Sequence, residues 1–177
     1  MNYNSQVRRG LLGTVLVIAL IVAGAVPAAA DSTPQATPFA QNWTDTGLIT
    51  ANDDWAAVPG IVGFLGQDIT TSAGTDPQTL LGVSTALPPD LDVIANQTTP
   101  NTLTAGGVAE FQITDPVVAL QGSGTADAPY LLLHLNTTGS SNISVAYTLR
   151  DIDASADNSI QPVALQYRVG PTVLWVA

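Results

Sequence analysis

Apolar and polar side chains alternate most regularly in two stretches near the end of the chain, residues 143–150 and 163–169. The apolar positions are Ile143, Val145, Tyr147 and Leu149 in the first stretch and Val163, Leu165, Tyr167 and Val169 in the second. Successive side chains of a β-strand point to opposite faces of a sheet, so each stretch predicts a strand with one apolar face.

Further short strands are predicted along the rest of the chain. Residues 131–135 (LLLHL) are apolar on both faces, which is typical of a central strand. Phe111 and Ile113 alternate with Glu110 and Gln112, which predicts a strand with one polar face. Weaker strand candidates are Leu48–Thr50, Ile61–Phe64, Leu91–Ala95, Val117–Leu120 and Val173–Val176.

Clusters of Gly, Pro, Asn and Asp separate these segments and predict turns, and no segment after residue 30 sustains a helical period. The predicted fold class is therefore all-β. We expect about eight or nine strands in an antiparallel two-sheet sandwich of the jelly-roll kind, preceded by a helical signal peptide.

Residues 1–30 have the pattern of a signal peptide. Arg8 and Arg9 precede the apolar run Leu11–Val26, and Ala28-Ala29-Ala30 supplies small residues for cleavage before Asp31. The run is shorter than the roughly 20 apolar residues of a membrane span, so we expect a cleaved, secreted protein. The twin arginine leaves open whether the secretory or the twin-arginine route is used.

After cleavage the chain is strongly acidic. Residues 31–38 (DSTPQATP) predict a flexible linker, and residues 39–177 are long enough for one domain. The net charge is −10, and removal of Arg8 and Arg9 leaves two arginines against fourteen acidic residues, or −12. Such a surface repels phosphates, so we expect no direct nucleic-acid binding and membrane contact only during export.

Four stretches of the mature chain resemble a known module: Asn42–Gly63, Leu120–Pro129, Asn142–Asp153 and Val163–Gly170. They are similar to the N-terminal β-sandwich module of large secreted bacterial multidomain proteins. Some of these proteins carry lamin-tail-like domains downstream, or an extracellular nuclease domain of the endonuclease/exonuclease/phosphatase class. The resemblance implies further strands after the Val163–Gly170 stretch, so we expect the C-terminal end of the module to be incomplete.

An acidic loop is the first candidate site. Asp151, Asp153, Ser155 and Asp157 place oxygen atoms at alternate positions, which is how a calcium loop surrounds a hard cation. Asp53 and Asp54 form a second acidic cluster, which a sandwich would be able to bring near the first. The alternative is a pair of solvated turns, because Ala156 stands where an EF-hand has its turn glycine. Structural calcium is therefore a hypothesis, and no other cofactor is expected.

Aromatic and titratable residues supply weaker candidates. Trp43, Trp55 and Tyr130 would suit a platform for sugar rings, although burial in the core is the more common role for such residues. His134 lies within a leucine-rich strand and is expected to be structural. Glu110 is the one glutamate, so a pair of glycosidase glutamates is excluded.

The sequence thus predicts a non-catalytic extracellular accessory or binding module. Its expected partners are downstream domains of a larger chain, or an extracellular polymer such as polysaccharide. Two alternatives stay open at this point. One is the N-terminal fragment of a secreted nuclease or hydrolase whose catalytic domain is absent, and the other is a carbohydrate-binding domain.

Overall fold

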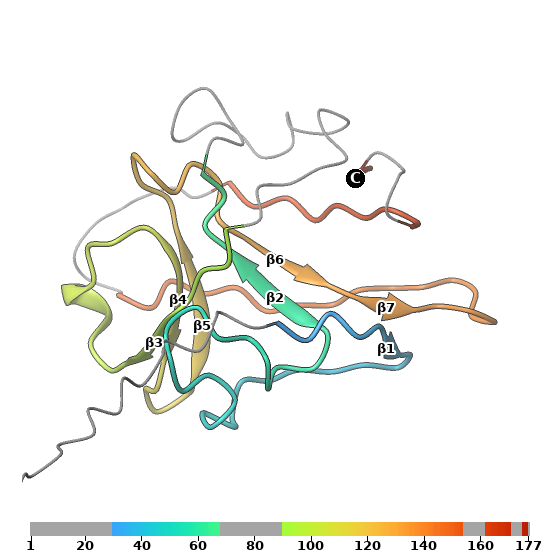
Figure 1. Ribbon diagram of the computed structural model, residues 1–177, viewed down its shortest axis with the longest axis horizontal. Helices are drawn as coiled ribbons and strands as arrows, with labels where there is room; N and C mark the ends of the chain where they lie inside the picture. Colours follow the sequence, from blue (N-terminus) through green and yellow to red (C-terminus); the bar gives the residue numbers. More distant parts are fainter. Residues whose placement is uncertain (1–29, 68–89, 154–161, 171–174, 177) are drawn as a thin grey trace, which may run out of the picture.

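The computed structural model describes residues 30–67, 90–153, 162–170 and 175–176 (Figure 1). In these parts the protein is built from strands, with one short 3-10 helix, η2 (Pro100–Thr102). The predicted all-β class is therefore confirmed for the described residues. The predicted signal peptide up to Ala29, and Ser155 and Asp157 of the acidic loop, lie outside them.

Two antiparallel strands cross the middle of the molecule, β2 (Ile61–Phe64) and β6 (Tyr130–Leu133). Ile61 pairs with Leu133 at one end of the ladder, and Phe64 pairs with Tyr130 at the other. The rings of Phe64 and Tyr130 stack with their centroids 4.8 Å apart and an interplanar angle of 11°. Strand β2 has the bounds that its apolar run predicted.

A second sheet contains β3 (Ile94–Gln97), β4 (Gly107–Phe111) and β5 (Val117–Gln121), with β4 in the centre. Strands β4 and β5 form an antiparallel hairpin, whereas β3 and β4 are parallel. The parallel pair is possible because residues 98–106, which include η2, carry the chain back to the start of the sheet.

The segment expected to be a flexible linker differs from that expectation. It carries β1 (Gln35–Ala36), which pairs in parallel with β7 (Leu135–Asn136). The backbone N–H of Gln35 donates to the carbonyl of His134 at 2.9 Å, and the N–H of Asp31 donates to the carbonyl of Trp55 at 3.4 Å. Strand pairing therefore orders residues that composition alone assigned to a linker.

The expectation of a purely antiparallel arrangement is wrong for two of the strand pairs, β1–β7 and β3–β4. Alternation within a strand says which side chains share a face, but it carries no information on the direction of the neighbouring strand. The described strands form two two-stranded sheets and one three-stranded sheet.

Trp55 lies at the centre of the core and is fully buried. Its indole N–H donates to the carbonyl of Asp92 at 3.1 Å, and its ring meets Trp43 edge to face at a centroid distance of 6.4 Å. Gly63 of β2 lies against the same indole. The buried residues packed with it are Ile49, Val58, Ile61, Val62, Val93, Ala95 and Val108.

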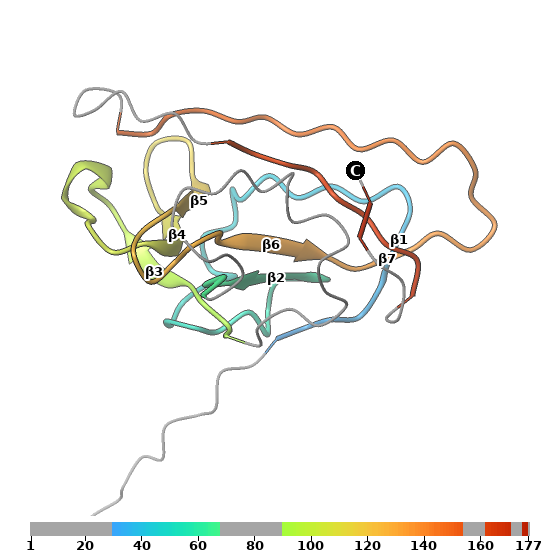
Figure 2. The ribbon, with the colours of Figure 1, turned by 90° about the horizontal axis from the view of Figure 1, so that it is seen from above.

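The two most regular alternations do not form strands in the described structure. Residues 142–150 run as an extended segment along the outside of the molecule, and residues 163–169 form a second extended segment (Figure 2). Their alternating apolar residues, expected on the inner face of a sheet, are exposed.

Candidate binding surface

The exposed apolar side chains of these two segments form a surface that we call the apolar layer. Its exposed fractions range from 47% at Ile143 to 76% at Val169. The members are Ile143, Val145, Tyr147, Leu149, Val163, Leu165, Tyr167 and Val169. Because large exposed apolar patches are uncommon on proteins and often serve in binding, these side chains are a candidate interaction site.

The turn after β7 positions the first segment. The side chain of Asn136 accepts a hydrogen bond from the N–H of Thr138 at 3.1 Å, and the N–H of Ser140 donates to the carbonyl of Thr137 at 2.9 Å. The Ser140 hydroxyl contacts that of Thr37 at 2.9 Å, which ties the turn to the segment after β1. The chain then runs back over the molecule.

Arg150 holds the far end of the same segment. Its guanidinium contacts the Asp115 carboxylate at 2.9 Å and also donates to the Asp115 carbonyl. Both side chains are well exposed, so this ion pair contributes little to stability. The segment is thus attached at its two ends and is free between them.

The backbone between these attachments lacks strand partners. In the described part of the chain, no backbone–backbone hydrogen bond involves residues 143–149. A strand with unpaired N–H and C=O groups is a template for pairing with another chain, and natural proteins usually protect such edges with charge or with covering segments. Here the side chains at alternate positions are apolar instead.

An open groove of about 630 Å³ separates this segment from the strands beneath it. Ile143, Val145 and Tyr147 line one wall of the groove. The apolar side chains on the other wall come from the segment after β1 and from β2, β6 and β7: Phe39, Trp43, Ile61, Leu133 and Leu135. The first segment therefore lies over an apolar surface without packing closely on it.

Charge is distributed unevenly around the apolar layer. Between Asp127 and Asp151 the sequence has no acidic residue, and none follows Asp157. Both segments of the layer lie in these acid-free stretches, and the only two arginines after residue 30, Arg150 and Arg168, lie in or beside the segments. The segments themselves thus carry no acidic side chain that would keep other chains away, and the Asp115 carboxylate at the end of the first one is paired with Arg150.

The exposed area represents a substantial free energy. Full burial of a side chain of this kind is worth about 1.5–3 kcal/mol relative to exposure in water. With about half of each of the eight side chains exposed, roughly 6–12 kcal/mol of possible apolar burial is unrealised. This is comparable with the whole stability of a small domain, so covering the layer would be strongly favourable.

The second segment makes one contact with the end of the chain. Tyr167 and Val176 form an antiparallel bridge with two backbone hydrogen bonds, of 2.8 Å and 2.9 Å. The guanidinium of Arg168 lies 4.5 Å from the centre of the Trp175 ring, a cation–π distance.

Three of the predicted calcium ligands accept backbone hydrogen bonds in the described part of the chain. The Asp151 carboxylate accepts from the N–H of Asp153 at 3.1 Å, and that of Asp54 accepts from the N–H of Ala56 at 3.0 Å. The carboxylate of Asp53 accepts from the N–H of Val93 at 3.2 Å. The described residues bring no three acidic or histidine side chains together as a metal site. Ser155 and Asp157 lie outside them, so the calcium loop stays a prediction.

The fold gives the three aromatic rings of the predicted sugar platform different positions. Trp55 is fully buried, while Tyr130 is half-buried and stacked on Phe64. Trp43 packs edge to face on Trp55 and lines the groove. The three rings therefore present no common exposed face to a sugar.

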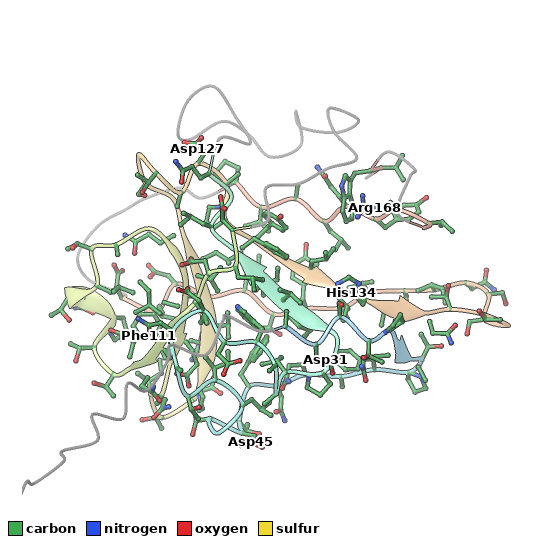
Figure 3. The ribbon with its side chains drawn as sticks, in the orientation of Figure 1. Asp31, Asp45, Phe111, Asp127, His134 and Arg168 are labelled. Carbon is green, nitrogen blue, oxygen red and sulfur yellow. The ribbon has the colours of Figure 1, made fainter. Side chains whose placement is uncertain are left out.

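His134 lies between β6 and β7, with Asp31 and Arg168 to either side of it (Figure 3). Partial burial lowers the pKa of its imidazole, and repulsion from Arg168 lowers it further, while Asp31 acts in the opposite direction. Its backbone donates to the carbonyl of Gly60 at 2.8 Å. These contacts fit the predicted structural role.

Two carboxylates have roles that the sequence did not indicate. Glu110 of β4 was placed on a polar face, yet it is buried and accepts a hydrogen bond of 2.7 Å from the N–H of Asn96. Asp92 accepts from the N–H of Val108 at 2.6 Å, and burial raises the pKa of its carboxyl group. Glu110 links β4 to β3, and Asp92 links β4 to the residues just before β3. Sequence spacing does not reveal that these segments are neighbours.

Comparison with known proteins gives no functional assignment, since no family model, curated protein or solved structure matches the chain. Within the described ranges, no helix has the length and apolar character that crossing a membrane requires. The surface described above is therefore the main evidence on function.

Proposed function

We propose that this chain is a non-catalytic, extracellular β-sandwich module that binds another polypeptide through its apolar layer. The exposed alternation of apolar residues along the two segments carries the proposal, because it supplies a hydrophobic surface and, in residues 143–149, backbone groups without backbone partners. In this proposal the two segments belong to the second sheet of a sandwich. Residues 1–30 act as the export signal, and downstream domains or an extracellular polymer are the partners to test.

The titratable residues support a role other than catalysis. The one histidine has a backbone environment typical of a structural strand residue, and the one glutamate is buried against the backbone of Asn96. Buried in this way, Glu110 is not placed to transfer a proton to a substrate at the surface. A carbohydrate-binding role is less favoured than polypeptide binding, because Trp55 offers no exposed ring.

The first experiment measures whether the apolar layer is accessible in the exported protein. We would express the full chain in a secreting host, determine the new N-terminus by mass spectrometry, and titrate the product with Nile red, a neutral dye for apolar surfaces. Cleavage before Asp31 and clear dye fluorescence are expected. Two variants of the layer, Val145→Ser and Leu165→Ser, should each reduce the fluorescence.

A matched control is Leu120→Ser on β5, since Leu120 is also partly exposed but lies outside the layer. This variant should leave most of the dye signal unchanged. Near-UV circular dichroism of the aromatic side chains checks that each variant folds. A folded protein whose dye binding is equally insensitive to all three substitutions would contradict the proposal.

A further inference from the structure

The unpaired segment has a sequence that is complementary to itself. We infer that a second copy of this chain pairs with residues 143–149 in an antiparallel, two-fold arrangement centred on Ala146. The inference rests on the proposed function and names the partner for this segment. It follows from the open edge, the order of apolar residues along it, and the distribution of charge.

Only one register satisfies the side-chain pattern. In an antiparallel pair centred on Ala146, Ile143 faces Leu149 of the second copy and Val145 faces its Tyr147, so that every apolar residue meets another apolar residue. A register shifted by one residue would place apolar side chains opposite polar ones on the wrong face.

Registers shifted by two residues also match the side chains less well than the register centred on Ala146. Centring the pair on Val145 places Leu149 opposite Ser141, and centring it on Tyr147 places Ile143 opposite Asp151. In the register centred on Ala146, the charged residue Arg150 faces Asn142, so no like charges are opposed. A two-fold interface requires this kind of self-complementary surface.

Charge opposes the meeting of two copies less at this edge than at other surfaces. Two chains of net charge −12 after signal removal repel each other over most of their surface. The stretch between Asp127 and Asp151 carries no carboxylate, so two copies are able to meet there without opposed acidic side chains. In the same register the apolar side chains of both copies lie on one face of the paired strands.

The chain contains no cysteine, which allows a direct test of the register. Directly opposed residues of antiparallel strands have Cα atoms about 4.5–5.5 Å apart, within the range that a disulfide bridges. Under mild oxidation, exported Ala146→Cys should form a covalent dimer. Ser144→Cys alone should form far less, whereas Ser144→Cys combined with Thr148→Cys should cross-link again, because residue 144 faces residue 148 of the second copy.

Sedimentation equilibrium of the exported protein measures the association itself. The unsubstituted protein should be a dimer, and Val145→Asp should raise its dissociation constant about tenfold or more by placing a charge in the apolar face. Leu120→Asp, a matched charge outside the segment, should leave the dimer intact. Hydrogen exchange should show protected amides in residues 143–149 that become unprotected in Val145→Asp.

Two results would overturn the inference. One is a monomer at all concentrations together with no preferential cross-linking at Ala146→Cys, and the other is a dimer that resists Val145→Asp and cross-links equally at Ser144→Cys. A monomer that still exposes the apolar layer to Nile red would leave the proposed binding function standing with a different partner. A folded monomer with protected amides in residues 143–149 and no dye binding would contradict both proposals.

Discussion

The Oε2 atom of Glu110 accepts a 2.7 Å hydrogen bond from the backbone N–H of Asn96, which has a positive φ of 58°. The contact joins β4 to β3 where the register between the two strands shifts. Since Asn96 leaves the regular ladder here, the carboxylate serves in place of a strand carbonyl. A buried glutamate thus completes the hydrogen bonding of an irregular strand.

The first prediction concerns this carboxylate. Glu110→Ala should lower the free energy of unfolding by about 1–3 kcal/mol, because it removes the acceptor of the Asn96 N–H and a side chain that is itself buried. Glu110→Gln keeps a side-chain oxygen and should lose less than half as much. Urea denaturation of the two variants measures the difference, and equal losses would show that the hydrogen bond is unimportant.

The second prediction concerns the contact between Gly63 and Trp55. A Cβ atom on Gly63 would lie 2.2 Å from the Cζ2 atom of the indole. Gly63→Ala should therefore destabilise the protein by about 1–3 kcal/mol and change its near-UV circular dichroism. Gly124→Ala is the matched control, since no heavy atom lies within 4 Å of its added Cβ. Similar melting temperatures for the two variants would contradict this packing.

The third prediction concerns Asp92. Burial raises the pKa of its carboxyl group above the ordinary 3.8, although the hydrogen bond from Val108 acts in the opposite direction. Between 3.8, the pKa in the unfolded chain, and the raised pKa of the folded state, the folded protein binds more protons than the unfolded chain. The contribution of Asp92 to stability therefore decreases as pH rises through that window. Asp92→Asn should flatten this part of the stability curve, measured by urea denaturation from acidic to neutral pH. An unchanged slope would contradict the assignment.

The fourth prediction concerns the single histidine, whose imidazole gives one NMR titration. Burial, followed by repulsion from Arg168, lowers the pKa of His134 below 6.5. Between the lowered pKa of the folded state and 6.5, the unfolded chain binds more protons than the folded protein. The contribution of His134 to stability is therefore present above pH 6.5 and is lost as pH falls through the folded-state pKa. Arg168→Gln should raise this pKa and Asp31→Asn should lower it. Shifts in the reverse directions would be inconsistent with the positions of these side chains.

The fifth prediction tests the acidic loop. If Asp151 and Asp153 help to hold calcium in the folded state, about 1 mM calcium should raise the melting temperature and a chelator should lower it. Asp153→Ala should abolish the difference, whereas Asp45→Asn, a change in another exposed turn, should preserve it. A calcium response that survives Asp153→Ala would place the ion elsewhere.

Local pattern predicted some strands closely. The apolar run Ile61–Phe64 gave β2 with its observed bounds, and Val117–Leu120 gave all but the last residue of β5. These strands are bounded by turn residues, so their limits follow from nearby sequence alone. The pairing of β1 with β7 and the parallel pairing of β3 with β4 depend on distant residues, which local alternation does not encode.

The candidate sites likewise combine features that local sequence reveals with features that depend on distant residues. Alternation placed Val145 and Tyr147 on one apolar face, but it does not reveal whether another strand covers that face. Asp53 and Asp54 were predicted as ligands because they are adjacent acids; an oxygen atom of each accepts a backbone hydrogen bond, and their role as ligands stays a prediction. Asp92 was not predicted at all, because its partner Val108 lies on a strand reached only through a crossover.

The pairing of β1 with β7 has a consequence for the order of folding. The hydroxyl groups of Thr37 and Ser140 meet although 103 positions separate them along the chain, so β1 has no strand partner until β7 (Leu135–Asn136) has been synthesised. Closing so long a loop is slow compared with forming the β4–β5 hairpin. Gln35–Ala36 is therefore synthesised early but completes the fold late, and during that interval it is accessible to chaperones and proteases.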